Sequence, residues 1–122
     1  MYKDFKDMDI WKDAMNVAEV IFALTEGLPK KEDYGLTSQI RRSALSISAN
    51  IAEAFGRHHI KEKINFYYFS RGSLIETLSH LEYGSRVGYF TKEKVAEIEI
   101  ILNKIYFELN KIIKSLKSKN PS

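Results

Sequence analysis

Apolar side chains recur along the chain at the three- and four-residue spacing of an α-helix, in four segments separated by polar or glycine-containing stretches. The segments cover about residues 8–26, 36–55, 61–86 and 92–116. The last has the most regular pattern, a heptad seam formed by Val95, Ile98, Leu102, Ile105, Leu109, Ile112 and Leu116. Short connections make consecutive helices antiparallel neighbours. We therefore predict an all-α fold, with residues 1–122 forming one up-down-up-down four-helix bundle.

The first predicted helix carries two adjoining apolar stripes. One stripe consists of Trp11, Met15, Ala18 and Phe22, and the other of Ile10, Val17, Ile21 and Leu24. Together they predict that this helix buries a wide surface.

More apolar residues are present than one bundle interior can hold. Ile100 and Phe107 lie off the heptad seam, and residues 66–69 read Phe-Tyr-Tyr-Phe, so their aromatic rings point in several directions. A helix that is apolar on more than one side is expected to be buried on more than one side. We predict a subunit interface, and we expect the rings of Tyr67, Tyr68 and Phe69 to pack rather than to stack on bases.

The second segment, QIRRSALSISANIAEAFGR, is unusually polar and small-sided. Its apolar face is narrow, and beside it runs a stripe that includes Gln39, Ser46, Asn50 and Glu53. Half-buried polar groups need partners, because an unsatisfied group costs about 1–3 kcal/mol. We expect these four residues to bond with Ser73 and Glu76 in a structural polar network. Gly72, in mid-helix, is expected to allow close contact with the small side chains of the second helix.

Composition narrows the class of protein. Charged residues make up 29% and hydrophobic residues 44%, which is typical of a globular domain. The chain has no cysteine, so disulfides and thiolate chemistry are excluded. Its N-terminus lacks a secretory h-region, and no apolar run approaches the length of a membrane span. We expect a cytoplasmic protein that does not associate with membranes.

Catalytic and metal-binding patterns are missing from the sequence. The three histidines are His58, His59 and His80. His58 and His59 are adjacent, so on a helix their side chains diverge by about 100° and cannot form the i, i+4 metal pair, and the spacing supplies no third ligand. Glu53 and Glu76 lack the Glu-x-x-His motif of di-metal bundles. No phosphate loop, nucleophile elbow or triad is recognisable. We therefore predict no catalytic residues, no metal, no cofactor and no enzymatic activity.

Basic residues are concentrated in the middle of the chain. Residues 35–86 contain seven basic and four acidic residues, whereas residues 1–34 contain five basic and eight acidic ones. Arginine binds phosphate bidentately, and phosphate contacts add up when an oligomer repeats them. The candidate nucleic-acid-binding residues are Arg41, Arg42, Arg57, Lys61, Lys63 and Arg71. A second interpretation remains open, in which these arginines serve subunit contacts in a protein-interaction scaffold that binds no nucleic acid.

Residues in the second and third helices also carry a family resemblance. The matching positions are Gln39, Arg41, Arg42, Ser46, Ile47, Asn50, Ile51, Ala52, Glu53, Arg57, Gly72, Ser73, Leu74 and Glu76, together with Trp11 and Ala14. They resemble the bacterial four-helix-bundle proteins encoded in intervening sequences of large-subunit ribosomal RNA genes. The accessory variability determinant of diversity-generating retroelements belongs to the same family.

The resemblance implies a homopentamer arranged around a central channel. For the retroelement branch it also implies an RNA or DNA partner and a reverse transcriptase. For the intervening-sequence branch it implies no activity. Ala54 and Ser48 depart from the family pattern, which more often has glycine and proline there, but neither lies in the polar stripe.

Overall fold

Four α-helices make up most of the computed structural model, which describes residues 2–119. Short 3-10 helices precede α1 and α2, and residues 2–119 contain no strand. The elements are η1 (Phe5–Asp7), α1 (Asp9–Thr25), η2 (Lys30–Glu32), α2 (Leu36–Gly56), α3 (Ile60–Arg86) and α4 (Lys92–Ser118). Each α-helix begins and ends within two residues of the predicted range.

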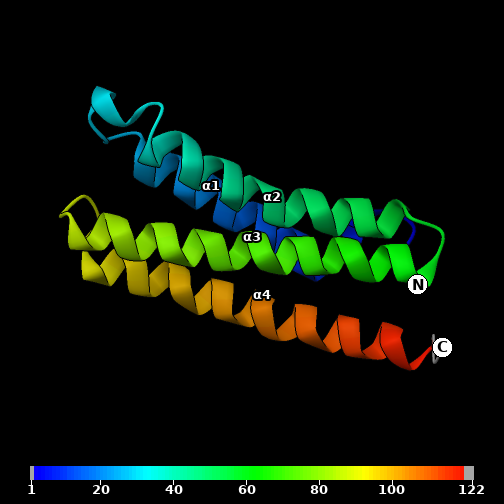
Figure 1. The fold of residues 1–122 in the computed structure, drawn as a ribbon. Helices are drawn as coiled ribbons and strands as arrows, with labels where there is room; N and C mark the ends of the chain where they lie inside the picture. Colours follow the sequence, from blue (N-terminus) through cyan, green and yellow to red (C-terminus); the bar gives the residue numbers. More distant parts are fainter. Residues whose placement is uncertain (1, 120–122) are drawn as a thin grey trace.

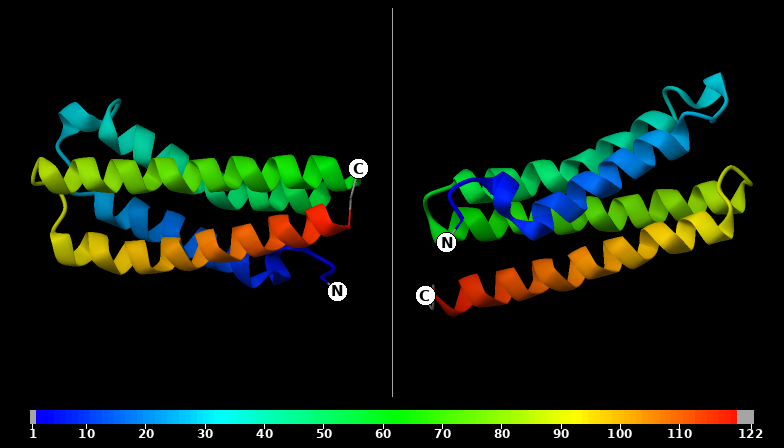
Figure 2. Two further views of the ribbon diagram at one scale, coloured as in Figure 1. Left: turned by 60° about the horizontal axis from the view of Figure 1, so that its bottom comes forward. Right: turned by 180° about the vertical axis from the view of Figure 1, so that it is seen from behind.

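The helices run alternately in opposite directions and form a closed square (Figures 1 and 2). Each helix contacts its neighbours in the chain, and α4 returns to contact α1. Within residues 2–119 the diagonal pairs make no such contact. The start of the chain, the α2–α3 turn and the end of α4 therefore lie at one end of the bundle, while η2 projects from the other.

The heptad seam of α4 lies in the core as the pattern predicts. Its central members are fully buried or nearly so, and we call them the aliphatic seam: Val95, Ile98, Leu102, Ile105 and Leu109. Near the end of the helix the buried position moves to Ile113, while Ile112 and Leu116 are half-buried against the core. A straight α-helix drifts by about 20° per heptad relative to a 3.5-residue repeat, which accounts for the move.

On α1 the prediction of a wide buried surface is wrong. One face is buried, formed by Ile10, Ala14, Val17, Ile21 and Thr25. Along the other stripe Trp11, Met15 and Ala18 are only half-buried, and the Phe22 side chain is 52% exposed. Two neighbouring helices cover one side of α1, so the outer stripe is left facing outward.

Gly72 does not make the predicted close contact with α2. It is exposed, and a Cβ built on it would meet nothing within 4 Å. The close approach is at Gly84, where a Cβ would lie 2.3 Å from two ring carbons of Phe90. Phe90 reaches this place because the chain reverses at Gly88, whose φ of 88° is in the left-handed region. The Gly84 carbonyl accepts hydrogen bonds from the backbone N–H groups of Tyr89 (2.8 Å) and Phe90 (3.2 Å).

A side-chain contact joins the two connections at this end of the bundle. The Tyr89 hydroxyl donates to Glu32 Oε2 at 2.9 Å, and Glu32 Oε1 accepts from the Leu36 N–H at 3.2 Å. These bonds, the one from Leu36 first, hold the pKa of Glu32 below its ordinary value. The same contact raises the pKa of Tyr89, because ionised tyrosine cannot donate a hydrogen bond to a carboxylate.

Candidate nucleic-acid interface

Arg41, the first candidate for binding phosphate, is occupied within the chain. Its Nε donates to Thr25 Oγ1 at 2.7 Å, and a terminal nitrogen donates to the Phe22 carbonyl at 3.2 Å. The guanidinium lies 4.2 Å from the Phe22 ring centre, and Glu26 is 3.5 Å away. A cation here complements the C-terminal end of α1. Arg41 therefore fastens α2 to α1.

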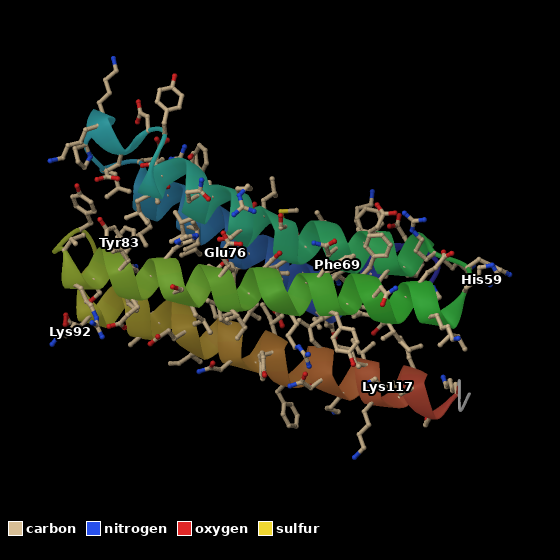
Figure 3. All side chains as sticks on the ribbon, viewed as in Figure 1. His59, Phe69, Glu76, Tyr83, Lys92 and Lys117 are labelled. Carbon is tan, nitrogen blue, oxygen red and sulfur yellow. The ribbon has the colours of Figure 1, made fainter. Side chains whose placement is uncertain are left out.

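Arg42 points to α3 instead. It forms an ion pair with Glu76 and donates to Gln39 Oε1 at 3.3 Å. The same Glu76 oxygen lies 3.1 Å from His80 Nε2. Figure 3 shows Glu76 on the side of α3 that faces α2. The Arg42 side chain is still 55% exposed, so this is a surface ion pair.

The end of α2 holds three further candidates. Arg57 pairs with Glu53 one turn earlier, at 2.8 and 3.0 Å, and lies over the Phe66 ring at 4.6 Å. Lys63 donates to the carbonyls of Ala54 and Phe55, both at 3.1 Å, so it caps α2.

Lys61 is exposed beside a shallow hollow at the α2–α3 turn, which His58 and His59 also line. Within residues 2–119 no carboxylate lies within ion-pair distance of it.

Arg71 differs from the other arginines because its partner is an amide. It donates to Asn110 Oδ1 at 2.8 Å and lies 4.7 Å from the Tyr68 ring centre. The ammonium of Lys117 lies near the same ring, at 5.2 Å. No carboxylate in the described part of the chain forms an ion pair with Arg71 or Lys117. We call Arg71, Tyr68, Asn110 and Lys117 the α3–α4 basic face.

The predicted polar network forms only in fragments. Asn50 donates to the Ser46 carbonyl within α2, Glu53 pairs with Arg57, and the Ser73 carbonyl accepts from Thr77. Gln39 and Glu76 meet only through Arg42. No hydrogen bond among residues 2–119 joins the side chains of Asn50 or Glu53 to α3. The stripe lies too far around α2, toward solvent, to reach across.

The buried polar contacts between α2 and α3 come from hydroxyls nearer the core. The Ser43 and Thr77 hydroxyl oxygens lie 2.8 Å apart, so one hydroxyl donates to the other. The hydroxyl that accepts this bond donates in turn to a carbonyl of its own helix, at Ile40 for Ser43 (3.2 Å) or at Ser73 for Thr77 (2.9 Å). Ser70 donates to the Ile47 carbonyl at 2.8 Å. We call Ser43, Ser70 and Thr77 the hydroxyl seam. Sequence reasoning missed it because small hydroxyls at core spacing were not distinguished from the outer stripe.

Charge gathers at one end of the bundle. Residues 104–119, which include the second half of α4, contain five lysines and one glutamate. They are far from residues 35–86 in the sequence, but the end of α4 lies at the same end of the bundle as the α2–α3 turn. Figure 3 shows Lys117 and His59 at this end and Lys92 at the other. The two basic regions thus become neighbours, which sequence order alone did not show.

Residues 2–119 contain no cluster of histidine, aspartate and glutamate that could hold a metal ion. Over the same residues no helix is long and apolar enough to span a bilayer.

Comparison with known families identifies the chain. The profile of the 23S rRNA-intervening sequence protein family matches residues 6–114, which include all four helices up to the last turn of α4. The chain belongs to this family. The match confirms the resemblance carried by the arginine- and glycine-containing motifs of α2 and α3. The family description indicates no catalytic activity.

A solved structure supports the same assignment. The fold is similar to a crystal structure from Bacteroides thetaiotaomicron, described as a protein of unknown function from the S23 ribosomal protein family. The TM-score is 0.78 at 27% identity, covering 86% of this chain and 98% of the other. The search of curated proteins found none that matches.

Proposed function

We propose that this chain is a non-enzymatic, self-assembling protein that binds nucleic acid through the α3–α4 basic face. The observation that carries the proposal is that Arg71 and Lys117 flank the half-buried ring of Tyr68 without a carboxylate partner in the described residues. Cations beside an aromatic ring are suited to backbone phosphates and to bases. Most α2 arginines are already paired with acids.

Lys111 and Lys114 lie on α4 between Asn110 and Lys117 in the sequence, and Lys61 lies in the first turn of α3, which begins at the same end of the bundle. Phosphate is bound through charge, and each neutralised phosphate releases counterions. One subunit offers only a few such contacts, so affinity would rise when assembly repeats the face around an axis.

Self-assembly is supported by apolar side chains that the four helices leave uncovered. Ile100 is 71% exposed and Phe107 is 62% exposed, two turns apart on the outward side of α4. On α3, Phe69 is 56% exposed and Ile75 is 50% exposed. Apolar surface of this extent often marks an interface between proteins. We propose that it contacts further copies of the chain, with the pentamer as the expected assembly.

Nucleic-acid binding is tested by gel shift and by fluorescence anisotropy over a salt series, using structured RNA and duplex DNA. The test variant is Arg71→Gln with Lys117→Gln, and the control is Arg42→Gln with Arg57→Gln. For duplex DNA, each lost phosphate contact should reduce the slope of log K against log salt by about 0.9. The test variant should lose about two units of slope by the same relation, and the control should lose less. Absence of binding at low salt would exclude the proposal.

Assembly is tested by sedimentation velocity on an Ile100→Glu, Phe107→Glu variant. The expected result is a shift to monomer, because both charges would be buried at the interface. Tyr34→Ser is the control, since Tyr34 is 97% exposed but lies on the α1–α2 connection. A wild-type protein that sediments as a monomer at micromolar concentration would contradict self-assembly.

A second candidate is a protein-interaction scaffold that binds no nucleic acid. The internal partners of Arg41, Arg42 and Arg57 favour it, because they show arginines in structural roles. Arg71→Gln with Lys117→Gln separates the two. Loss of assembly in this variant favours the scaffold, and intact assembly with weakened binding favours nucleic acid.

A further inference from the structure

A cavity of about 410 Å³ lies where the start of α1 meets α3 and α4. Its volume is within the usual range for sites that bind small molecules. Part of the wall is apolar and comes from Met8, Ile10 and Ile112. The remainder is polar and includes Asp9, Asp13, Lys104 and Glu108. Nothing in the proposed nucleic-acid surface uses this cavity.

The titratable groups give the cavity an excess of negative charge. Asp9, Asp13 and Glu108 contribute carboxylates, and Lys104 is the only cation among the described residues that line it. Lys104 lies 3.1 Å from Asp13 and neutralises that carboxylate. Glu108 has Lys111 at 3.9 Å, too far for a hydrogen bond, and no ion pair involves Asp9 in the described part of the chain. Asp9 is thus left without an ion pair and Glu108 has only a long one, so the lining attracts a cation.

A buried phenol adds a second and independent observation. Tyr67 is only 5% exposed, and it lines the cavity. The Tyr67 hydroxyl makes no hydrogen bond to any described residue. Within residues 2–119, Thr37 Oγ1 is the one unpaired side-chain atom that is completely enclosed, so the Tyr67 oxygen keeps some exposed surface. The Tyr67 oxygen therefore faces the cavity space. Burial raises the pKa of Tyr67, so the phenol stays neutral and can accept or donate a hydrogen bond.

The structure assigns this cavity to an aliphatic amine with two or more ammonium groups, in the class of short diamines and polyamines. Ammonium groups bind the carboxylates of Asp9 and Glu108, and an N–H donates to the Tyr67 oxygen. The methylene chain lies against the apolar wall formed by Met8, Ile10 and Ile112. A metal ion is a poor fit because no ligand cluster is present in residues 2–119. An anion would be repelled because three carboxylates and one ammonium group line the cavity.

The experiment is isothermal titration of the purified protein, free of nucleic acid, with putrescine and spermidine. Binding to one site per chain is expected, tighter for spermidine and weaker at high salt. The neutral control ligand is 1,4-butanediol, which has the methylene chain of putrescine without its charges, and it should not bind. Equal binding of butanediol, or no saturable binding at millimolar amine, would overturn the assignment.

Variants locate the site. Asp9→Asn with Glu108→Gln should weaken spermidine binding by more than about tenfold, because charge-assisted hydrogen bonds are lost. Tyr67→Phe should weaken it by about fivefold, since the hydrogen bond to the phenol oxygen is lost.

The matched control is Glu93→Gln with Glu97→Gln, which removes two exposed acids from the far end of α4 and should leave binding unchanged. If the control weakens binding as much as the Asp9 and Glu108 variant, the amine is held by diffuse surface charge and the site is excluded. A thermal shift with spermidine, present in wild type and absent in Asp9→Asn with Glu108→Gln, gives a second readout on folded protein.

Discussion

The two long seams of the bundle are built from opposite kinds of side chain. The aliphatic seam of α4 consists of branched apolar residues, whose burial is favourable but not directional. The hydroxyl seam between α2 and α3 consists of small polar residues whose hydrogen bonds are directional. The difference indicates that α4 supplies a large share of the apolar burial, while the α2–α3 seam fixes how the helices are aligned.

Truncation of the aliphatic seam should have the largest effect. Leu102 is fully buried, so Leu102→Ala removes apolar contacts and leaves a cavity. We expect it to lower the free energy of unfolding by about 2–5 kcal/mol, measured by urea denaturation. Asn103→Ala, at the next residue and exposed, is the control for a change on the same helix. A loss below that of the control would mean that α4 packs only loosely on the core.

Removal of a hydroxyl should have a smaller but more specific effect. Thr77→Val keeps the shape of the side chain but loses the bonds to Ser43 and to the Ser73 carbonyl. We expect a cost of about 1 kcal/mol in the free energy of unfolding, because a buried hydrogen bond between the helices is lost while the Ser43 hydroxyl keeps the Ile40 carbonyl as its acceptor at 3.2 Å.

A double-mutant cycle sharpens this prediction. Ser43→Ala combined with Thr77→Val should cost less than the sum of the two single changes, because each single change already removes the hydrogen bond that the two hydroxyls share. Additive costs would show that the two hydroxyls do not interact, which would contradict the role of the hydroxyl seam in aligning α2 and α3.

The two adjacent arginines test whether directional contacts outside the seams matter. Arg41→Gln should destabilise the fold by about 1 kcal/mol, because Arg41 bonds the end of α1 from a half-buried position. Arg42→Gln should cost less than about 1 kcal/mol, since its ion pair with Glu76 is exposed. Thermal unfolding of both variants gives the comparison. The reverse order would contradict the assigned roles.

The smallest effect concerns pH and the contact between Glu32 and Tyr89. The pKa of Glu32 is lowered from 4.5, so the contact stabilises the fold above that pH and its contribution is lost as the pH falls below it. The raised pKa of Tyr89 has the opposite sign, so its contribution is lost as the pH rises above 10.0. Wild type and Tyr89→Phe should therefore differ in melting temperature at neutral pH and converge at both extremes. A difference in melting temperature that does not change with pH would show that ionisation of Glu32 and Tyr89 does not affect stability.

Sequence reasoning reached the four helices because their spacing is strong over long segments, and it reached the family because the α2 and α3 motifs are specific. It failed where two faces of one helix are both apolar, as at Trp11 and Phe22, since periodicity does not say which face a neighbour covers. It also placed the glycine contact at Gly72 instead of Gly84. Contact across helices depends on how they cross, and a single sequence does not contain that geometry.

The candidate site shows the same limit. The cluster of basic residues was visible, but not the internal partners that occupy Arg41, Arg42, Arg57 and Lys63. Nor was it visible that antiparallel packing of α3 and α4 brings Lys117 to the same ring as Arg71. The same packing brings Asn110 to Arg71, although the two are 39 residues apart in the sequence. Tertiary structure places carboxylates and carbonyls near these cations. A count of basic residues along the sequence therefore overstates how many side chains are free to bind phosphate.

The packing of Phe90 on Gly84 has a practical consequence for labelling the molecule. The Phe90 ring packs on the Gly84 backbone, and the N–H groups of Tyr89 and Phe90 both donate to the Gly84 carbonyl, so the α3–α4 connection cannot accept an insertion without losing these contacts. A reporter peptide inserted within residues 85–89 would displace the Phe90 ring from Gly84 and destabilise that end of the bundle. The exposed tip at Tyr34, on the opposite connection, is the better place to attach a dye or an epitope.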